Sequence, residues 1–591
     1  MNIFKTLNNI LDSYNIKISG ETYQDIINEK VRSIIFRMIN EDKKVAIRGA
    51  GEHTTNLLKL VPELKVEYIF DRNVSDEEEC IINHKRYKLK PDNIVNNIDC
   101  VIISSFAHRK KMTSEIKELD ESIEIIDIYE ILNNNGFCVN EPFFKITRES
   151  YESFIYYRNK YEEENTPENL KSVIKSSVDI CDFINFYNYC NIYINNKYEG
   201  YKEVFNAKHE VEKLFFKVKE IIQARDSKDI VMIWNDQVGY SELPKMKYVY
   251  KMSKKSLFFK KAYTMTPFTY PVFMEMFQNL KSLDDNIYTN QYPKINYDNS
   301  KFLKRVEDAG YNFVYIGDES DGSLFANVDV ITKYTYGSSN VRALEMLQKL
   351  ICDKRPLFIL LHALVETHNP YLSADLNIPI WYEWPYFQGD SQECVSIQAD
   401  VSLKYWDKQL EYYMNFLGEN TIKIFMSDHG KRFGTLPIYH DVTTHVLCFV
   451  TGKNIPNVKY NKVFSLFDFN RLVKAILSED YNQDKICSDM IFFQETAIFN
   501  KTAIRYYIER ECLEASMAFR AVRTENELFV RISNGTEHYY INGDEANDRI
   551  FEKCYESRVN YLRNYVSNNF DKAALNQEML ELFRDKYETH E

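Results

Sequence analysis

The chain has 591 residues, with 74 Lys and Arg against 87 Asp and Glu, so its net charge is −13. This length exceeds what one hydrophobic core serves, and two or three domains are expected. The acidic balance argues against nucleic-acid binding and against an anionic membrane surface. No apolar run approaches the ~18 residues of a transmembrane segment, and no secretory signal is expected. The 11 cysteines are scattered, which favours reduced thiols in a cytoplasmic protein.

Residues 1–140 alternate short apolar runs with helical patterns, which predicts a Rossmann-like α/β domain. In the stretch VAIRGAGEHTTNLL a β-rich run meets Gly49 and Gly51 before a helical pattern starts. A glycine turn at a helix N-terminus can hold phosphate, and Asp71 ends the second predicted strand, where a ribose would bind. Gly49, Gly51 and Asp71 are therefore candidate nucleotide-binding residues. The glycine signature is incomplete, and a scaffold or oligomerisation module is the alternative.

Three further segments follow in the sequence. Residues 141–228 have little glycine or proline and long helical patterns, which predicts a helical connector. Strand–helix alternation resumes over 229–500 and predicts a doubly wound α/β domain. Residues 501–591 contain alternating runs around an SNGT turn, and then a charged helix. We expect this last segment to complete the second α/β domain.

Polar residues follow two predicted strands of the second α/β domain. Asn235 and Asp236 end the run DIVMIW, and Asp428 and His429 follow the run IKIFM. Ligands bind at the carboxyl ends of strands in a doubly wound sheet. Carboxylate and imidazole ligands from two such ends suit a divalent cation such as zinc or manganese. A pair of polar turns is the alternative.

A threonine-rich segment lies between these two strand ends, in KKAYTMTPFTYPVFMEMF. Thr264, Thr266 and Thr269 precede an apolar helical pattern with prolines near its start. A hydroxyl at a helix N-terminus lies where phosphate or sulfate is stabilised, and beside a metal it can act as a nucleophile. An N-cap threonine is the structural alternative.

Histidines are concentrated in the same domain, because five of the 11 in the chain fall within its candidate site segments. These five are His362, His368, His429, His440 and His445. A histidine just past a strand end can bind a substrate oxygen or protonate a leaving group.

Several segments in a fixed order resemble the alkaline phosphatase superfamily, in its sulfatase-like branch. They are IVMIWNDQVGYSELP, TPFTYPVFMEMF, FLKRVEDAGYNFVYIGD, LFILLHALVETHNPYL with its His-x-Pro-Tyr element, and the helix that leads into IKIFMSDHG. The resemblance covers about 229–545, a little over half of the chain. It implies an alkaline-phosphatase-like mixed sheet with helices on both faces, and hydrolase or transferase activity.

The resemblance also implies roles for individual residues. The metal ligands would be Asp236, Asp428 and His429, with Asn235 as a fourth. His368 would hold the oxygens of the transferred group, and His440 or His445 would line the pocket. The nucleophile would be Thr269 if Thr-Tyr-Pro matches the nucleophile-x-Pro element, or Thr266 on the pattern of the phosphoethanolamine transferases.

One departure from the sulfatases limits the chemistry. Sulfatases require a cysteine or serine that becomes formylglycine, followed by x-Pro-x-Arg, whereas this chain has threonine there and Phe273 in place of the arginine. We therefore expect phosphoryl transfer or phosphoester hydrolysis on a phosphorylated small molecule, lipid or glycan, as in surface-glycan modification. The cofactor would be zinc or manganese, with calcium or magnesium as alternatives. The competing hypotheses are a degenerate, nucleotide-sugar-binding assembly module and, less favoured, a sulfuric ester hydrolase; the sequence gives no oligomeric state.

Overall fold

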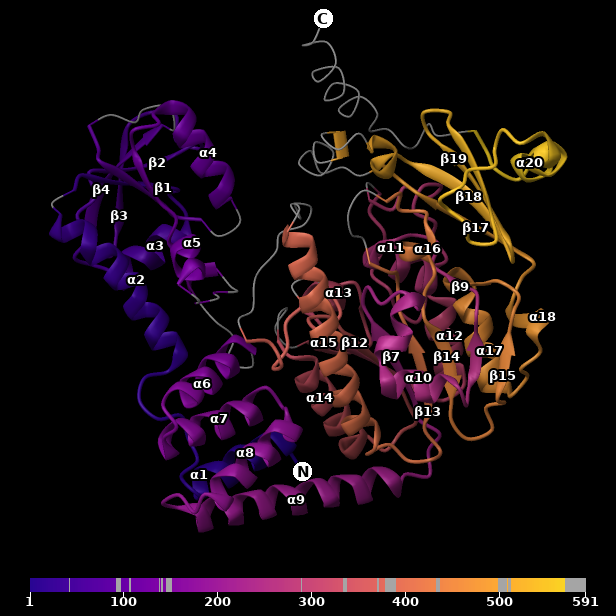
Figure 1. The fold of residues 1–591 in the computed structure, drawn as a ribbon, viewed down its shortest axis with the longest axis horizontal. Coiled ribbons are helices and arrows are strands. Elements are labelled where there is room, and N and C mark those ends of the chain that lie inside the picture. The colour runs from indigo at the N-terminus through magenta and orange to yellow at the C-terminus, as the bar shows by residue number, and fades with distance from the viewer. Residues whose placement is uncertain are drawn as a thin grey trace, which may run out of the picture. The chain divides into compact units, whose positions relative to one another are not determined.

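The computed structural model describes most of the chain in two compact units, one formed mainly by Leu11–Ala207 and the other by Met1–Ile10 and the residues from Lys208 onward (Figure 1). The described residues are 1–41, 43–91, 97–105, 108–135, 137, 139, 142–144, 151–288, 290–332, 337–368, 371–377, 390–431, 436–497, 507–508 and 512–568. Each unit is described by itself. The finer four-part division of the chain stays a prediction.

The first unit contains a six-stranded sheet in the order β3-β4-β2-β1-β5-β6. Its strands are β1 (Val45–Arg48), β2 (Tyr68–Asp71), β3 (Glu78–Ile82), β4 (Lys85–Pro91), β5 (Cys100–Ile103) and β6 (Glu124–Ile126). Neighbouring strands are parallel, except that β3 runs antiparallel to β4. The helices of this part are α2 (Tyr23–Asn40), α3 (Glu52–Leu60), α4 (Arg109–Leu119) and α5 (Ile128–Asn134). The sheet and its helices show the predicted α/β character of this part, and its Rossmann-like classification stays a prediction.

Four consecutive helices follow in the sequence. They are α6 (Tyr151–Glu163), α7 (Pro167–Asp179), α8 (Phe183–Asn195) and α9 (Tyr201–Gln223). Thr166 and Asp182 accept hydrogen bonds from backbone N–H groups in the first turns of α7 and α8, and Pro167 occupies the first position of α7. These caps end the preceding loops and start each helix where the sequence predicts helical structure.

The second unit is built on an eight-stranded mixed sheet in the order β11-β10-β12-β7-β13-β14-β8-β15. The strands are β7 (Ile230–Asn235), β8 (Leu257–Phe259), β10 (Asn312–Gly317), β11 (Asp329–Thr332), β12 (Leu357–Ala363), β13 (Ile422–Met426), β14 (Cys448–Thr451) and β15 (Val458–Tyr460). The five strands from β11 to β13 in this order are parallel, and β14 is antiparallel to both neighbours. This mixed sheet with flanking helices confirms the predicted fold class.

Helices and short strands connect and cover this sheet. They include α10 (Lys247–Ser253), β9 (Ala262–Tyr263), α11 (Thr269–Phe273), the π-helical η3 (Met274–Gln278), α12 (Lys301–Asp308), α13 (Glu319–Gly322), α14 (Ser339–Cys352), α15 (Asp390–Met414), α16 (Asp441–Thr444), β16 (Phe464–Ser465), α17 (Phe469–Ser478) and α18 (Gln483–Ile486). Every residue of β7 and β12 is buried. Strands buried on both faces are typical of a parallel sheet covered by helices.

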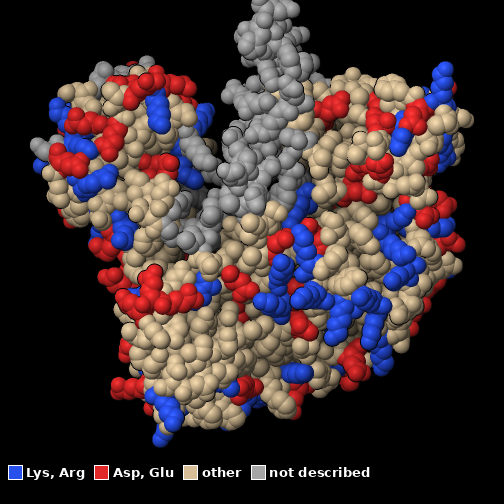
Figure 2. Space-filling model, viewed as in Figure 1, with Lys and Arg blue, Asp and Glu red and all other residues tan. Residues whose placement is uncertain are grey.

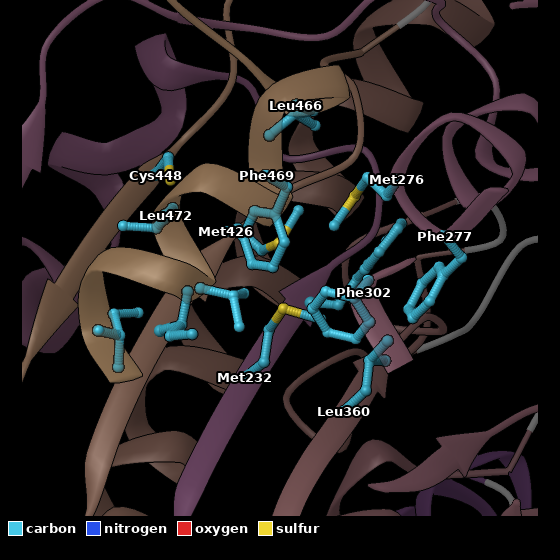
Figure 3. Close-up of a cluster of buried hydrophobic side chains, with 14 of the residues drawn as sticks. Met232, Met276, Phe277, Phe302, Leu360, Met426, Cys448, Leu466, Phe469 and Leu472 are labelled. Carbon is cyan, nitrogen blue, oxygen red and sulfur yellow. The ribbon is translucent and has the colours of Figure 1, made fainter. Parts of the chain in front are cut away.

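The main hydrophobic core fixes the relative position of three central strands. Met232, Leu360 and Met426 come from β7, β12 and β13, and they pack with Phe302 of α12 and Phe469 of α17 (Figure 3). All five side chains are at most 1% exposed. Because such a core is close-packed, a change of strand register would disrupt many contacts at once.

The surface carries both signs of charge. Figure 2 shows basic and acidic side chains interspersed over most of the face in view. None of the helices within the described ranges is long and apolar enough to cross a membrane.

The C-terminal part of the second unit is a four-stranded antiparallel sheet, β17 (Met490–Glu495), β18 (Phe519–Thr524), β19 (Glu527–Ile532) and β20 (Glu537–Ile541), followed by α20 (Glu556–Arg563). On β20, His538 Nδ1 lies 2.8 Å from Asp548 and Nε2 lies 3.2 Å from Glu514. Burial lowers the pKa of His538, but the hydrogen bonds to Asp548 and Glu514 outweigh it and raise that pKa to about 9. The protonated imidazole therefore joins the sheet to the 3-10 helix η5 (Leu513–Ser516) and to the turn that contains Asp548.

This bridge predicts a pH-dependent stability. A histidine whose folded pKa is raised stabilises the fold fully below its unfolded pKa, and this contribution is lost as pH rises through the folded value. We expect wild type to exceed His538→Gln by on the order of 2 kcal/mol in unfolding free energy at pH 6, with the difference declining between pH ~6.5 and ~9. Urea denaturation across this pH range measures it. A difference that does not change with pH would contradict the charged bridge.

Candidate metal centre and nucleophile

Three candidate metal-ligand side chains meet at the carboxyl ends of two adjacent parallel strands. β7 pairs with β13 so that Trp234 lies opposite Met426. Asp236 follows the first strand, and Asp428 and His429 follow the second. All three side chains are buried, and their ligand atoms lie within 4.8 Å of one another. The predicted convergence of two strand ends therefore takes place in the folded chain.

The unpartnered atoms of this cluster face one another. Asp236 Oδ1 and Asp428 Oδ2 are buried and have no hydrogen-bond partner within the described part of the chain. His429 Nδ1 donates to the carbonyl of Gly430 at 2.8 Å, so Nε2 is the ring nitrogen on the side of the two carboxylates. Nε2 lies 3.9 Å from Asp236 Oδ1 and 3.6 Å from Asp428 Oδ2. Two orphaned carboxylate oxygens around an imidazole nitrogen fit a divalent cation.

The other oxygen of Asp428 is held by the backbone. Asp428 Oδ1 accepts hydrogen bonds from the N–H groups of Gln237 at 3.0 Å and of His429 at 2.8 Å. Gln237 has a φ of 61°, which is unusual for a residue with a side chain. Its side-chain oxygen accepts a hydrogen bond from the Tyr371 hydroxyl at 2.5 Å. This strained turn orients one oxygen toward the backbone and leaves the other for the cluster.

The structure separates the two candidate nucleophiles. Thr269, the first residue of α11, has its hydroxyl 3.3 Å from Asp236 Oδ2 and 3.5 Å from His429 Nε2. Thr266 is fully buried and instead donates its hydroxyl hydrogen to Glu495. Thr269 is thus the threonine at the metal-ligand cluster. Thr264 donates to the carbonyl of Thr266 at 2.7 Å.

A buried histidine that the ligand prediction did not include orients Asp236. His362 Nε2 donates to Asp236 Oδ2 at 3.1 Å, and its Nδ1 lies 3.1 Å from the Tyr315 hydroxyl. Burial opposes the ionisation of Asp236. The charge of His368 and the hydrogen bond from His362 outweigh it, so that the pKa of the Asp236 carboxyl is well below its usual range. Asp236 is therefore held as a carboxylate.

A second group of ligand-type side chains adjoins this histidine, formed by Asp318, Asp321 and His362. Both ring nitrogens of His362 already have hydrogen-bond partners, and Asp318 accepts from the N–H of Asp321 at 2.9 Å. This arrangement supports an orienting role for His362. Gly317 is required for it, because an added Cβ would overlap the Tyr315 hydroxyl.

The remaining predicted residues of this domain have other contacts. Asn235 Oδ1 accepts a hydrogen bond from the Trp406 indole at 2.9 Å, which engages the oxygen proposed as a fourth ligand. His368 is partly buried and its charge acts on Asp236, while Pro370 of the same element lies outside the described residues. His440 lies 3.6 Å from Glu545.

His445 is packed as a structural residue. Its ring stacks on Tyr240 at 4.2 Å and on Tyr263 at 4.8 Å, and its Nε2 donates to the carbonyl of Lys260 at 2.8 Å. Burial lowers the pKa values of His440 and His445 to about 4. Both rings are therefore neutral near pH 7.

The glycine turn of the first unit is stabilised by its own residues. Gly49 has a φ of 106°, and an added Cβ would lie 2.9 Å from the carbonyl of Ser104. Gly51 is the N-cap of α3, without a side-chain cap. The carboxylate of Asp71 accepts hydrogen bonds from the N–H groups of Ala50 and Asn73, both at 2.9 Å. These contacts explain why Gly49 and Asp71 are needed for the turn, whereas an added Cβ at Gly51 would meet no described atom within 4 Å. Nucleotide binding stays a prediction.

The fold is similar to solved structures of sulfatases and related hydrolases. No protein-family model and no curated protein matches the sequence. A putative sulfatase from Bacteroides thetaiotaomicron shares 12% identity with a TM-score of 0.45, covering 59% of this chain and 93% of that one. The phosphonate monoester hydrolase of Agrobacterium radiobacter shares 11% identity with a TM-score of 0.44, covering 57% of this chain and 94% of that one. An alkaline phosphatase superfamily protein from Vibrio parahaemolyticus shares 11% identity with a TM-score of 0.40, covering 63% of this chain and 96% of that one.

The hydrogen bonds that link Tyr315 through His362 to Asp236 predict an effect on metal affinity. We expect Gly317→Ala, which displaces the Tyr315 side chain, and Tyr315→Phe, which removes its hydroxyl, to weaken Mn²⁺ or Zn²⁺ binding about 10-fold, as is typical for groups that orient a ligand. Isothermal titration of the metal-free protein measures this. Tyr311→Phe is the control for loss of a hydroxyl elsewhere in the unit. Unchanged affinity in Tyr315→Phe would show that the hydroxyl does not orient Asp236 through His362.

Proposed function

We propose that the chain is a metal-dependent phosphoester hydrolase or phosphoryl transferase with Thr269 as its nucleophile. The observation that carries the proposal is the hydroxyl of Thr269 at hydrogen-bond distance from Asp236 and His429. A nucleophile and its activating groups within such reach are the geometric signature of covalent catalysis.

Asp236, Asp428 and His429 would hold the cation. Two carboxylate oxygens and one imidazole nitrogen suit zinc or manganese better than calcium or magnesium, which prefer oxygen ligands alone. When bound, the cation would supply Lewis acidity, lowering the pKa of a nearby hydroxyl and offsetting charge on a phosphoryl oxygen. The orphaned oxygens of Asp236 and Asp428 support this assignment and disfavour a degenerate, metal-free module.

The chain's own residues would carry the proton and bond changes. The Thr269 hydroxyl donates to Asp236 Oδ2, which orients the threonine oxygen for attack. Because the low pKa of Asp236 makes this carboxylate a weak base, the hydroxyl proton would pass to solvent. The threonine oxygen would attack phosphorus opposite the leaving oxygen, forming the Thr269 O–P bond as the ester P–O bond breaks. His368 would donate a proton to the departing oxygen. Water or an acceptor hydroxyl would then displace the threonine from phosphorus.

Two features favour phosphoryl transfer over sulfate-ester hydrolysis. Threonine cannot form the aldehyde that sulfatases use. Phe273, at the position of the sulfatase arginine, is fully buried and stacks on Trp234 with 4.6 Å between ring centroids. That position is therefore part of the core and brings no positive charge to a substrate. A glycan, lipid or small-molecule phosphoester is the proposed substrate class, and surface-glycan modification is the proposed context.

The test combines metal content with trapping of the covalent intermediate. We expect wild type to contain zinc or manganese and to hydrolyse bis-p-nitrophenyl phosphate faster than p-nitrophenyl sulfate. Asp428→Ala/His429→Ala should lose the metal and the activity. Thr269→Ala should keep the metal and lose roughly 10³-fold or more in kcat, because the nucleophile is gone.

Two controls sharpen this test. Thr536→Ala, at the tip of the C-terminal hairpin, should match wild type. After acid quenching, the phosphoryl group should map to the peptide position of Thr269 by mass spectrometry. A phosphoryl group on Thr266, or sulfate-ester turnover that exceeds phosphoester turnover, would overturn the proposal.

A further inference from the structure

Two buried carboxyl groups lie beside the nucleophile helix, outside the metal-ligand cluster. Glu275 belongs to the π-helical η3 that directly continues α11, and Glu495 is the last residue of β17. Both side chains are 0% exposed. Burial raises the pKa of Glu275 well above its usual value, and the charge of Glu495 raises it further. The two groups are therefore close enough to interact, and neither belongs to the site described above.

Burial raises the pKa of Glu495 to about 7, and the hydrogen bonds around its carboxyl group oppose this rise. Oε1 accepts from the N–H of Thr496 at 2.7 Å and from its hydroxyl at 3.2 Å. Oε2 accepts from the hydroxyl of Thr266. Hydrogen bonds donated to both oxygens stabilise a carboxylate and oppose the effect of burial.

Glu275 differs from Glu495, because no hydrogen bond from the described residues stabilises its carboxylate. Neither of its carboxyl oxygens has a hydrogen-bond partner in the described structure. The described basic group whose charge acts on it is Lys281, which is 39% exposed and lies 3.8 Å from Asp284. Protonation of Glu275 would remove the charge but would leave a buried O–H donor unpaired. A bound cation would balance the buried negative charge of Glu275 and would contact its unpaired oxygens.

We propose that Glu275, Glu495 and the hydroxyl oxygen of Thr266 hold a divalent cation, Ca²⁺ or Mg²⁺. Two carboxylates neutralise two positive charges, and the ligand atoms are all oxygens, which these hard cations prefer. The cluster of Asp236, Asp428 and His429 differs in that it contains an imidazole. This second site goes beyond the proposed function and does not depend on it.

Such an ion would fix the nucleophile helix from the side away from its first turn. It would join η3 to the end of β17 and to the segment that contains Thr266, three residues before Thr269. π-helical turns within α-helices recur at functional sites, and this one places Glu275 six residues after the nucleophile. The ion would therefore act as a positioning element and not as part of the chemistry.

The first experiment isolates this site by removing the other one. In metal-free buffer, the melting temperature of Asp428→Ala/His429→Ala is recorded as CaCl₂ or MgCl₂ is added, because a ligand that binds the folded state raises it. We expect a saturable rise with one of the two cations. Adding Glu275→Gln to this variant should abolish the rise, and adding the exposed control Glu307→Gln should leave it intact.

The second experiment counts ions by elemental analysis after exhaustive dialysis with Ca²⁺ or Mg²⁺ present. We expect Glu275→Gln and Glu495→Gln to lose one oxygen-ligated cation per chain while keeping the zinc or manganese that Asp428→Ala/His429→Ala loses. If neither CaCl₂ nor MgCl₂ raises the melting temperature of Asp428→Ala/His429→Ala, the proposed site is wrong. This outcome can be read even if the glutamate variants fail to fold. A glutamine variant that keeps the cation would also overturn the site. A glutamine variant that is more stable than wild type in metal-free buffer would overturn it too, because this would mean that Glu275 and Glu495 share a proton.

Discussion

The parallel pairing of β7 with β13 is the constraint on which the candidate site depends. Trp234 and Met426 are opposite each other in the ladder, so the residues that follow the two strands reach the same edge of the sheet. Met232 and Met426 lie in one closely packed core with helices α12 and α17, which holds this register (Figure 3). A slip of one residue would turn these buried side chains to the other face and separate Asp236 from Asp428. Core packing and ligand geometry are thus consequences of the same register.

The concentration of buried negative charge at this edge requires specific compensation. Asp236 is stabilised by the hydrogen bond from His362, which is itself held by the Tyr315 hydroxyl. Asp428 is stabilised on one side by two backbone N–H groups. One oxygen of each carboxylate nevertheless lacks a protein partner, and leaving a charge buried in this way costs several kcal/mol. The protein therefore provides most of the stabilisation of a cation site, and the cation would complete it.

Much of the fold, and the position of the cluster, could be predicted from the sequence. The strand ends at Asp236 and at Asp428 are visible because apolar β-rich runs stop abruptly at polar residues, and parallel strands end at a common edge. The choice between Thr266 and Thr269 could not be made, because both precede the same helix. It depends on Glu495, which is distant in sequence and accepts a hydrogen bond from Thr266. A local pattern contains no information about such a partner.

The contacts of other residues could not be predicted from the sequence for a related reason. Asn235 has a suitable oxygen and position, but Trp406 from α15 donates to that oxygen. His362 lies inside the buried strand β12, where the pattern shows only one polar residue in an apolar run, and its role depends on β7 and β10 on either side. Gly317 ends β10 without any turn signal, and its requirement is visible only once the Tyr315 ring lies across it.

The helix that carries Thr269 shows how these long-range contacts combine. Its first residue contacts Asp236 at the end of β7, and its continuation places Glu275 within the influence of Glu495 at the end of β17. Thr269 is therefore positioned between the large mixed sheet and the C-terminal antiparallel sheet. Because α11 and η3 together are only ten residues long, such a helix has little stability of its own, and its geometry is set by what holds its two ends. A change at the end of β17 is therefore expected to alter the position of the Thr269 hydroxyl at the end of β7.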